Sequence, residues 1–381
     1  MRFTPILRQA SRADTLAFIG VGRMGNHMVN NILLSSLSSP NHPQLQSAAG
    51  DFSPEWLHMK SGKPKRILIC DPFKENVDNT LRRMREVLGS SGGVEVGVVE
   101  NPYEAALSAS TLVSMIPTHT HVQSVYTGAP SSSSSSTSSS VSPDSTVLAA
   151  LKGGKLGKNE VENTLCIEQS TIRMDVSQQV GKEIEGAGGM WVDAPVSGGV
   201  NGAENASLTI MCGASSPASF ERAKPVLGMM GKKVIMCGGL GMGLAAKLCN
   251  NMQLGISMLG LSEAMLMGKK LGLDSELLGN IINTSTGQCW ASSINFPVPG
   301  VHLPTVAKPP PASRSYEGGF VTALAHKDLD LAVEAARHVD APLYVGRLAE
   351  EIFRKVRGTE DWDARDFSIV YKWLEEKSGA E

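Results

Sequence analysis

The stretch Gly20-Val21-Gly22-Arg23-Met24-Gly25 follows a short apolar run at residues 15–19 and precedes residues that can continue as a helix to about Leu34. This order predicts a strand, a tight turn and a helix. Glycines allow such a turn and let a ligand approach the backbone, while the helix N-terminus faces a pyrophosphate. We therefore expect a dinucleotide to bind at five residues of this turn: Gly20, Gly22, Arg23, Met24 and Gly25.

A second strand is expected from Arg66, and it ends on the carboxylate of Asp71. A carboxylate in that place can accept hydrogen bonds from a ribose diol and repel a 2'-phosphate, which favours NAD over NADP. The usual separation from the glycines is about 20 residues, and an aperiodic insertion at residues 35–65 accounts for the excess here. Asp71 can also cap the helix that follows Pro72, and the two roles are compatible.

Strands and helices continue to alternate after Asp71. Further strands are expected at residues 94–99, 111–116, 164–167, 190–193, 208–212 and 234–237. This alternation predicts an α/β domain at residues 15–240, with a mostly parallel, doubly wound sheet of the Rossmann type. A serine-rich stretch at residues 131–146 cannot bury a core face and is expected to be a surface loop.

A long, mainly apolar helix is expected at residues 244–271. A helix that is apolar on all sides must be surrounded by protein. We expect it to run between two domains and to form the spine of an all-helical C-terminal domain at residues 241–381. The length of 381 residues and the hydrophobic content of 41% also favour two domains.

The charge balance limits the partners of the chain. With 35 basic and 37 acidic residues, there is no broad attraction for nucleic acid or for a membrane surface. No cluster of His, Asp, Glu or Cys has metal-ligand spacing, so a metal site is not expected. Residues 1–14 carry three arginines and no acid before Asp14. This pattern favours a presequence for the mitochondrial matrix over a frayed basic terminus.

Two segments carry groups suited to acid-base chemistry on a small acid. Lys247 and Asn251 are four residues apart, so both project from one face of the long helix. An ammonium in apolar surroundings loses hydration, which lowers its pKa and lets it exchange a proton near neutrality. The turn Ser197-Gly198-Gly199 offers a hydroxyl and open backbone N–H groups for a carboxylate, and Asn251 can donate a further hydrogen bond.

Several motifs in order resemble the β-hydroxyacid dehydrogenase family. They are the glycine turn, Asp193-Ala194-Pro195-Val196-Ser197-Gly198-Gly199-Val200, Gly243-Leu244-Ala245-Ala246-Lys247-Leu248-Cys249-Asn250-Asn251, Gly287-Gln288-Cys289-Trp290, Asn295-Phe296-Pro297-Val298-Pro299-Gly300-Val301, Gly318-Gly319-Phe320, Lys327-Asp328-Leu329 and Asp366-Phe367-Ser368. The resemblance runs from about Thr15 to Glu376 and is interrupted only at the two insertions. It is closest to the members that oxidise 3-hydroxyisobutyrate to methylmalonate semialdehyde in valine breakdown.

The resemblance implies a role for each matched residue. Ser197, Gly198, Gly199 and Asn251 would hold the substrate carboxylate, and Lys247 would take the hydroxyl proton while NAD takes the hydride. The further cofactor contacts would be Ile116, Pro117, Thr118, His121, Thr171 and Lys327, with Asp328 orienting Lys327. Two departures from the family pattern are His121, where relatives often have Asn, and Glu168, where they often have Asp. The family also implies a homodimer or homotetramer.

Three alternatives stay open at this point. A reductase of a small aldehyde acid, such as tartronate semialdehyde, would share the motifs common to the family. A non-catalytic NAD-binding scaffold would keep the fold, although the presence of Lys247 and Asn251 argues against it. His119 and His121 are rival acid-base groups, because histidine titrates near neutrality.

Overall fold

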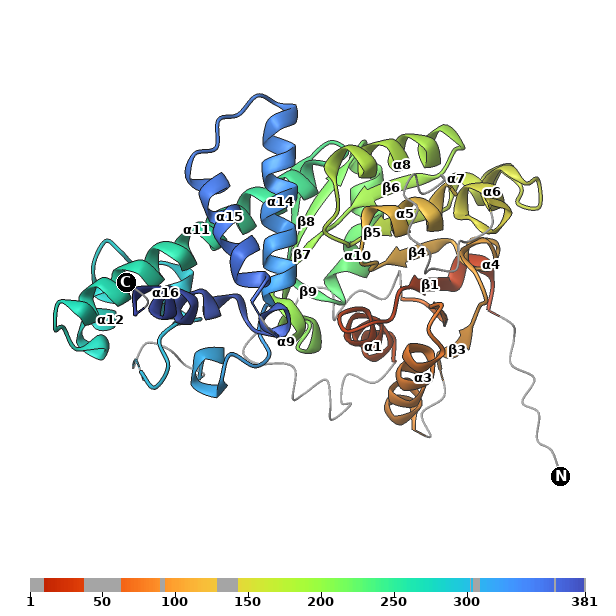
Figure 1. Cartoon of the computed structure of the whole chain (residues 1–381). Coiled ribbons are helices and arrows are strands. Elements are labelled where there is room, and N and C mark those ends of the chain that lie inside the picture. Colours follow the sequence, from red (N-terminus) through yellow and green to blue (C-terminus); the bar gives the residue numbers. More distant parts are fainter. Residues whose placement is uncertain are drawn as a thin grey trace. The chain divides into compact units, whose positions relative to one another are not determined.

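The computed structural model describes residues 10–37, 63–89, 93–128, 143–301, 303, 309–359 and 361–379. Most of the predicted insertion, the serine tract and residues 1–9 of the predicted presequence lie outside these residues. The chain forms two compact units, residues 1–246 and residues 247–381 (Figure 1). The boundary between them falls inside the predicted long helix.

The first unit is built on a sheet that has nine strands among the residues described. They are β1 (Thr15–Ile19), β2 (Arg66–Cys70), β3 (Glu95–Val98), β4 (Thr111–Ser114), β5 (Leu165–Glu168), β6 (Met190–Asp193), β7 (Val196–Ser197), β8 (Leu208–Ala214) and β9 (Gly231–Gly238). Their order is β3-β2-β1-β4-β5-β6-β8-β7, with β9 paired to β8. Strands β1 to β6 pair in parallel, and β8 runs antiparallel to β6 and β7. The predicted mostly parallel sheet is confirmed.

Alternate residues of the central strands belong to two separate apolar cores. On β1, Leu16 and Phe18 pack into one core, and Ala17 and Ile19 pack into the other. Successive side chains of a strand point to opposite faces of the sheet. Both faces are therefore covered by protein, which explains why β1 reads as a continuous apolar run.

Helices cover both faces of the sheet, as a doubly wound fold requires (Figure 1). One core includes residues of α1 (Gly25–Ser36), α3 (Lys74–Leu88), α9 (Gly199–Glu204) and α10 (Pro217–Gly228). The other includes residues of α4 (Pro102–Ser108), α5 (His119–Tyr126), α6 (Val147–Lys152), α7 (Lys158–Glu162) and α8 (Met174–Gly186). Two short 3-10 helices, η1 (Arg12–Asp14) and η3 (Pro143–Ser145), complete the unit as described.

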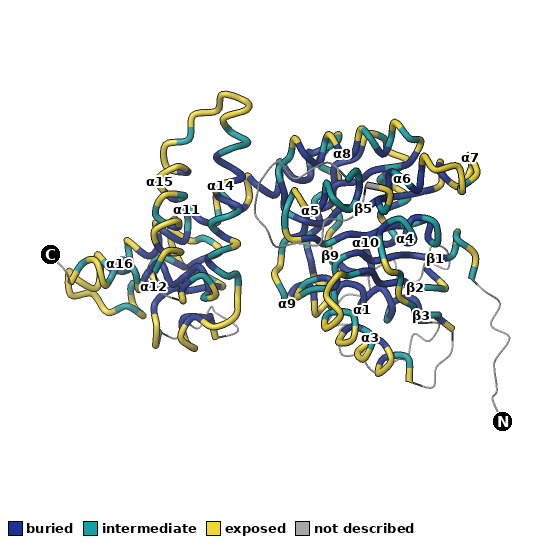
Figure 2. Tube along the Cα trace, turned by 45° about the vertical axis from the view of Figure 1, so that its right-hand side comes forward, coloured by how far each residue is buried: buried dark blue, intermediate teal, exposed yellow. Residues whose placement is uncertain are grey.

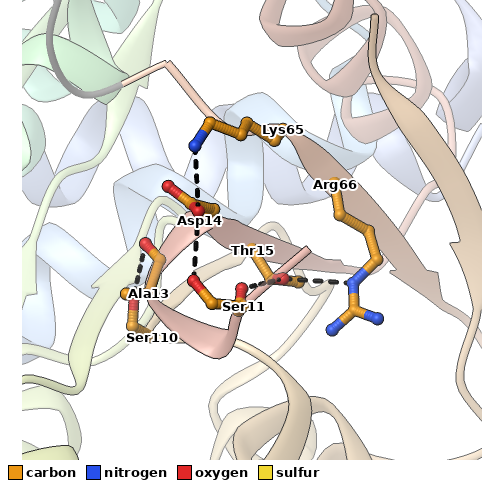
Figure 3. A network of polar contacts seen from close by, with 7 residues as sticks. All are labelled: Ser11, Ala13, Asp14, Thr15, Lys65, Arg66 and Ser110. Atoms are coloured by element: carbon orange, nitrogen blue, oxygen red, sulfur yellow. Dashed lines mark hydrogen bonds and ion pairs between the residues drawn. The ribbon is translucent and has the colours of Figure 1, made fainter. Parts of the chain in front are cut away.

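Polar contacts join the segment before β1 to the start of β2 (Figure 3). Asp14 Oδ2 pairs with Lys65 Nζ at 3.1 Å and accepts a hydrogen bond from Ser11 Oγ at 3.1 Å. Arg66 Nε donates to Thr15 Oγ1, also at 3.1 Å. Asp14, the last residue of the predicted presequence, is therefore paired with the residue that precedes β2.

The second unit is helical, as predicted. The long helix α11 (Met242–Lys270) starts in the last residues of the first unit. The helices that follow are α12 (Ser275–Thr284), α13 (Trp290–Ser293), α14 (Thr322–His338), α15 (Val345–Arg357) and α16 (Val370–Ser378). The 3-10 helices of this unit are η4 (Pro311–Arg314), η5 (Trp362–Ala364) and η6 (Phe367–Ile369). The core of this unit includes Met258 of α11, Leu329 of α14 and Phe353 of α15, and Figure 2 colours its buried residues dark blue. None of the described helices has the length and apolar character needed to cross a membrane.

Candidate active site

The glycine turn lies between β1 and α1, and its three glycines meet different surroundings. Gly20 has a φ of +87°, and a Cβ there would collide with the backbone oxygen of Met115. A Cβ on Gly25 would collide with the backbone oxygen of Gly20. A Cβ on Gly22 would meet no atom within 4 Å, and its φ is an ordinary one. The fold thus requires glycine at the two ends of the turn, whereas Gly22 leaves an open stretch of backbone that fits a pyrophosphate.

Asp71 lies beside this turn, as predicted. Its Oδ2 accepts a hydrogen bond from Val21 N at 2.8 Å, and its Oδ1 accepts from Phe73 N at 2.9 Å and from Asn76 Nδ2 at 3.2 Å. The bond to Phe73 N is at the start of α3, so the carboxylate also serves the helix start. Of the other turn residues, Arg23 is exposed and Met24 packs partly against the core.

The predicted residues at the end of β4 lead into α5. Ile116 is buried, and its backbone N–H donates to Ser170 Oγ at 2.6 Å, which joins the ends of β4 and β5. Thr118 is the N-cap of α5 and accepts from His121 N at 3.3 Å, while its Oγ1 lies 2.7 Å from His121 Nδ1. Pro117 and His121 are exposed, and Thr171 is half-buried. His121 therefore takes part in the cap of α5 through its hydrogen bonds with Thr118. This hydrogen-bonding role is an alternative to the acid-base role considered for His121.

Glu168 ends β5 as a buried carboxyl group. Its Oε1 accepts a hydrogen bond from Ser170 N at 2.6 Å, so Glu168 supports the serine that holds Ile116. Burial raises the pKa of Glu168 to about 7, although the hydrogen bonds from Ser170 oppose this shift. The sequence singled out Glu168 only as a departure from the family pattern. Ser170, which the family resemblance also places beside the cofactor, and Glu168 thus support the predicted cofactor segment.

In the turn Ser197-Gly198-Gly199, Ser197 ends β7, Gly198 is the N-cap of α9 and Gly199 is its first residue. Ser197 is half-buried, and both glycines are exposed. Gly198 has a φ of +136° and Gly199 a φ of +61°, backbone conformations that L side chains rarely adopt. The glycines therefore shape a turn whose backbone is open to a ligand.

Lys247 and Asn251 project from one face of α11 in the second unit. Both are buried, with 7% and 5% of their surface exposed. Burial lowers the pKa of Lys247, and of the charges that act on it, Asp328 raises the pKa and Lys327 lowers it. A buried lysine with a lowered pKa is suited to proton exchange.

Asp328, on α14, connects the remaining predicted residues of the second unit. Its Oδ2 accepts a hydrogen bond from Asn251 Nδ2 at 2.6 Å, and its Oδ1 lies 3.4 Å from Lys327 Nζ. Asn251 Oδ1 in turn accepts from Asn250 Nδ2 at 3.0 Å. An amide nitrogen has two hydrogens, and the bond to Asp328 uses one of the two N–H groups of Asn251. Lys327 and Asp328 are separated from Asn251 by about 77 positions, and only the family motif pointed to them.

Three further motifs of the resemblance meet at Asp366. Its carboxylate accepts hydrogen bonds from Asn295 Nδ2 at 2.9 Å, Phe320 N at 2.8 Å and Ser368 N at 3.0 Å. These motifs are thus held together by one buried carboxylate. Among the described residues, no group of three or more His, Cys, Asp or Glu side chains could hold a metal ion.

Two family models match the chain. Residues 132–239 match the "NAD binding domain of 6-phosphogluconate dehydrogenase", and residues 241–374 match "NAD-binding of NADP-dependent 3-hydroxyisobutyrate dehydrogenase". The match at residues 132–239 begins after the glycine turn. The assignment of that turn as a nucleotide site therefore depends on its geometry and on the relatives that match over nearly the whole chain.

Relatives match over nearly the whole chain. The mitochondrial 3-hydroxyisobutyrate dehydrogenase of Homo sapiens is 34% identical, covering 97% of this chain and 89% of its own. A probable mitochondrial 3-hydroxyisobutyrate dehydrogenase of Dictyostelium discoideum is 32% identical over 96% of this chain and 92% of its own. A solved Mycobacterium tuberculosis 3-hydroxyisobutyrate dehydrogenase, in a structure with L-serine, is 31% identical, with a TM-score of 0.71 over 95% of this chain and 99% of its own. The chain belongs to the 3-hydroxyisobutyrate dehydrogenase family.

Proposed function

We propose that this protein oxidises 3-hydroxyisobutyrate to methylmalonate semialdehyde with NAD, as a step of valine breakdown, and that Lys247 takes the hydroxyl proton. The observation that carries the proposal is the burial of Lys247 beside Asn251 and Asp328. A scaffold protein without turnover gains nothing from a buried lysine, whose desolvation destabilises its charged form.

The reaction removes a hydride from the carbinol carbon and a proton from its hydroxyl group. Bound NAD supplies the hydride acceptor. Lys247 must be a neutral amine to accept the proton at Nζ, and its lowered pKa increases the neutral fraction below the ordinary lysine range. The rate of oxidation should therefore rise with pH until Lys247 is deprotonated.

Two sets of groups would bind the substrate carboxylate. The hydroxyl of Ser197 is one donor, and the backbone N–H groups of Gly198 and Gly199 are two more, at residues that carry no Cβ. The remaining N–H of Asn251 is a further donor, and Asp328 holds the other N–H of that amide. A carboxylate bound by several donors is oriented as well as attracted.

NAD is the cofactor in this proposal, and Asp71 supports the choice over NADP. Asp71→Ser, combined with a basic residue nearby, should weaken NAD use and improve NADP use, because it removes a negative charge that would repel a 2'-phosphate. The ratio of kcat/KM for the two coenzymes measures this effect. A wild-type protein that already prefers NADP would overturn this role of Asp71.

The deciding experiment is a panel of 3-hydroxy acids and small aldehyde acids tested with NAD and NADP. The proposal predicts the highest kcat/KM for 3-hydroxyisobutyrate with NAD. A higher kcat/KM for the reduction of tartronate semialdehyde would identify that compound as the substrate and leave the reaction class unchanged. No turnover with any member of the panel would favour the scaffold.

The protein is proposed to act in the mitochondrial matrix, after removal of an N-terminal presequence. Its relatives named above from Homo sapiens and Dictyostelium discoideum are named mitochondrial. Arg12 donates hydrogen bonds to Ala106 O and Thr164 Oγ1, both at 2.8 Å, so cleavage after Asp14 would remove contacts of the first unit. Cleavage before Arg12 keeps them. N-terminal sequencing of the mature protein from mitochondria measures the site.

A homodimer or homotetramer is the proposed assembly. Apolar side chains are exposed at the end of α11 and along α12, among them Met267, Leu271 and Leu277, with 61%, 74% and 54% of their surface accessible. Exposed apolar side chains in such a group favour association. Light scattering after gel filtration gives the mass in solution, and a monomer would contradict the proposal.

A further inference from the structure

Asp193 connects the end of a strand to the beginning of the long helix. It is the last residue of β6 and is fully buried. Its Oδ1 accepts a hydrogen bond from Gly241 N at 2.7 Å, and its Oδ2 accepts from Leu244 N at 3.1 Å. The first N–H groups of a helix have no partner inside that helix. The carboxylate of Asp193 therefore caps α11.

Two glycines make room for this carboxylate. Gly213 is the register partner of Asp193 on β8, and a Cβ there would lie 2.5 Å from Asp193 Oδ1 and 2.6 Å from Gly239 O. A Cβ on Gly243 would lie 2.8 Å from Asp193 Oδ2. Neither glycine has a positive φ, so space and not backbone conformation requires the missing side chain. The surroundings are shaped around the two oxygens of Asp193.

A neutral cap would cost less to bury than a carboxylate. Burial raises the pKa of Asp193 to about 6, while the backbone hydrogen bonds from Gly241 and Leu244 oppose the shift. An asparagine has an NH₂ group in place of one carboxylate oxygen, so at one of the two positions it presents a donor to a backbone N–H. The cap as built requires a side chain with two acceptor oxygens.

We propose that Asp193 is a positioning residue for Lys247, because it fixes the first turn of α11. Leu244 precedes Lys247 by three residues in the same helix, which is less than one turn. A loosened first turn would admit water to the Lys247 amine, which is now buried and whose charged neighbours are Asp328 and Lys327 of α14. The kinetic part of this inference rests on the proposed function.

Asp193→Asn tests the inference, with Asp274→Asn as a matched control. Asp274 caps α12 by accepting from Leu277 N at 2.8 Å, so the control makes the same Asp→Asn change at the cap of a helix that carries no candidate residue. For Asp193→Asn we expect kcat to fall about 10-fold to 100-fold, as for a small misplacement of a catalytic group. The Kd of NADH should stay within about 2-fold, because the glycine turn and Asp71 are unchanged. The rise of kcat with pH should move to higher pH, since a hydrated lysine has a higher pKa.

A second readout needs no substrate. An amine-reactive acylating reagent labels neutral, accessible lysines, and peptide mass spectrometry gives the rate at Lys247. At a pH high enough that the amine is neutral in both proteins, the rate reports accessibility alone, and we expect labelling of Lys247 to be at least ~5-fold faster in Asp193→Asn and unchanged in Asp274→Asn. If Asp193→Asn does not fold, Gly213→Ala displaces the same carboxylate and undergoes both measurements.

The outcomes separate this inference from the proposed function. In an active enzyme, kcat and labelling must change together, and a change in either one alone overturns the positioning role. If the wild-type protein turns over none of the panel, the proposed function fails, and labelling alone decides whether Asp193 holds Lys247 in place. Unchanged labelling would then reduce Asp193 to a structural cap.

Discussion

The two units present their candidate groups in different ways. In the first unit, the groups are mainly backbone N–H groups of glycine turns at the carboxyl ends of strands, at Gly20–Gly25 and at Ser197–Gly199. In the second unit they are side chains on two helices, with Lys247 and Asn251 on α11 and Lys327 and Asp328 on α14. Backbone groups offer binding without titration, whereas the lysine side chain offers a proton acceptor. Substitutions in the nucleotide turn of the first unit should therefore change the affinity for NAD, whereas substitution of Lys247 in the second should change the chemical step.

The largest effect is expected for Lys247→Ala. Loss of a positioned acid-base group lowers kcat by about 100-fold to 10,000-fold, while NAD binding should remain close to wild type. Asn251→Ala should mainly raise KM, because the substrate carboxylate is present in both the ground state and the transition state. Steady-state kinetics beside NAD titration by fluorescence measures both variants.

Lys269→Ala is the control for Lys247→Ala. Lys269 lies on the same helix, but it is exposed and pairs with Glu375 at 2.6 Å. It should leave kcat unchanged. A near-normal kcat in Lys247→Ala would instead move the acid-base role to His119 or His121.

The first unit could be predicted well because its signals are local. The strand at Thr15–Ile19, the glycine turn and the strand at Met190–Asp193 occur where the apolar runs and glycines indicated. The apolar pattern predicts a strand from Val234, whereas β9 begins at Gly231. The pattern misses its first residues because Lys232 and Lys233 are exposed and are not apolar. The two-residue strand β7 is too short to leave a periodic signal.

Contacts between distant segments could not be predicted from residue spacing. Asn251 and Asp328 meet because α11 and α14 pack together, and Asp193 reaches the start of α11 through the pairing of β6 with β8. The family resemblance supplied the residue types of these motifs. It did not supply the hydrogen bonds that join them, which depend on tertiary packing.

Asp366→Ala should affect stability, because Asp366 ties three segments of the second unit together. The substitution leaves the N–H donors of Asn295, Phe320 and Ser368 without their acceptor, and the free energy of unfolding should fall by on the order of 3 to 5 kcal/mol. Urea unfolding measures the loss. Asp361→Ala is the control, because Asp361 is exposed and pairs only at the surface with Arg365. Equal stability of the two variants would contradict the structural role of Asp366.

A smaller, pH-dependent effect is expected for Glu168→Gln in the first unit. The folded-state pKa of Glu168 is raised from 4.5 to about 7, so the folded protein binds the proton more tightly than the unfolded chain. Stability from this group is then present below pH 4.5 and is lost as the pH rises to about 7. Glutamine does not titrate and can still accept from Ser170 N. The variant should match wild type at pH 4 and exceed its free energy of unfolding at pH 8 by on the order of 3 kcal/mol. A difference that does not vary with pH would contradict the raised pKa.

The smallest effect concerns the middle glycine of the nucleotide turn, and it tests whether the first unit acts through its backbone. A Cβ on Gly22 meets no protein atom within 4 Å, so Gly22→Ala should leave the melting temperature unchanged. The same methyl group would occupy the space of an approaching pyrophosphate, and NAD should bind at least about 10-fold more weakly, or about 1.4 kcal/mol. Gly25→Ala is the matched comparison, because its Cβ would collide with Gly20 O. That variant should lose stability together with affinity. Calorimetry and NADH fluorescence separate the two quantities, and wild-type affinity in Gly22→Ala would mean that no ligand approaches this stretch of backbone.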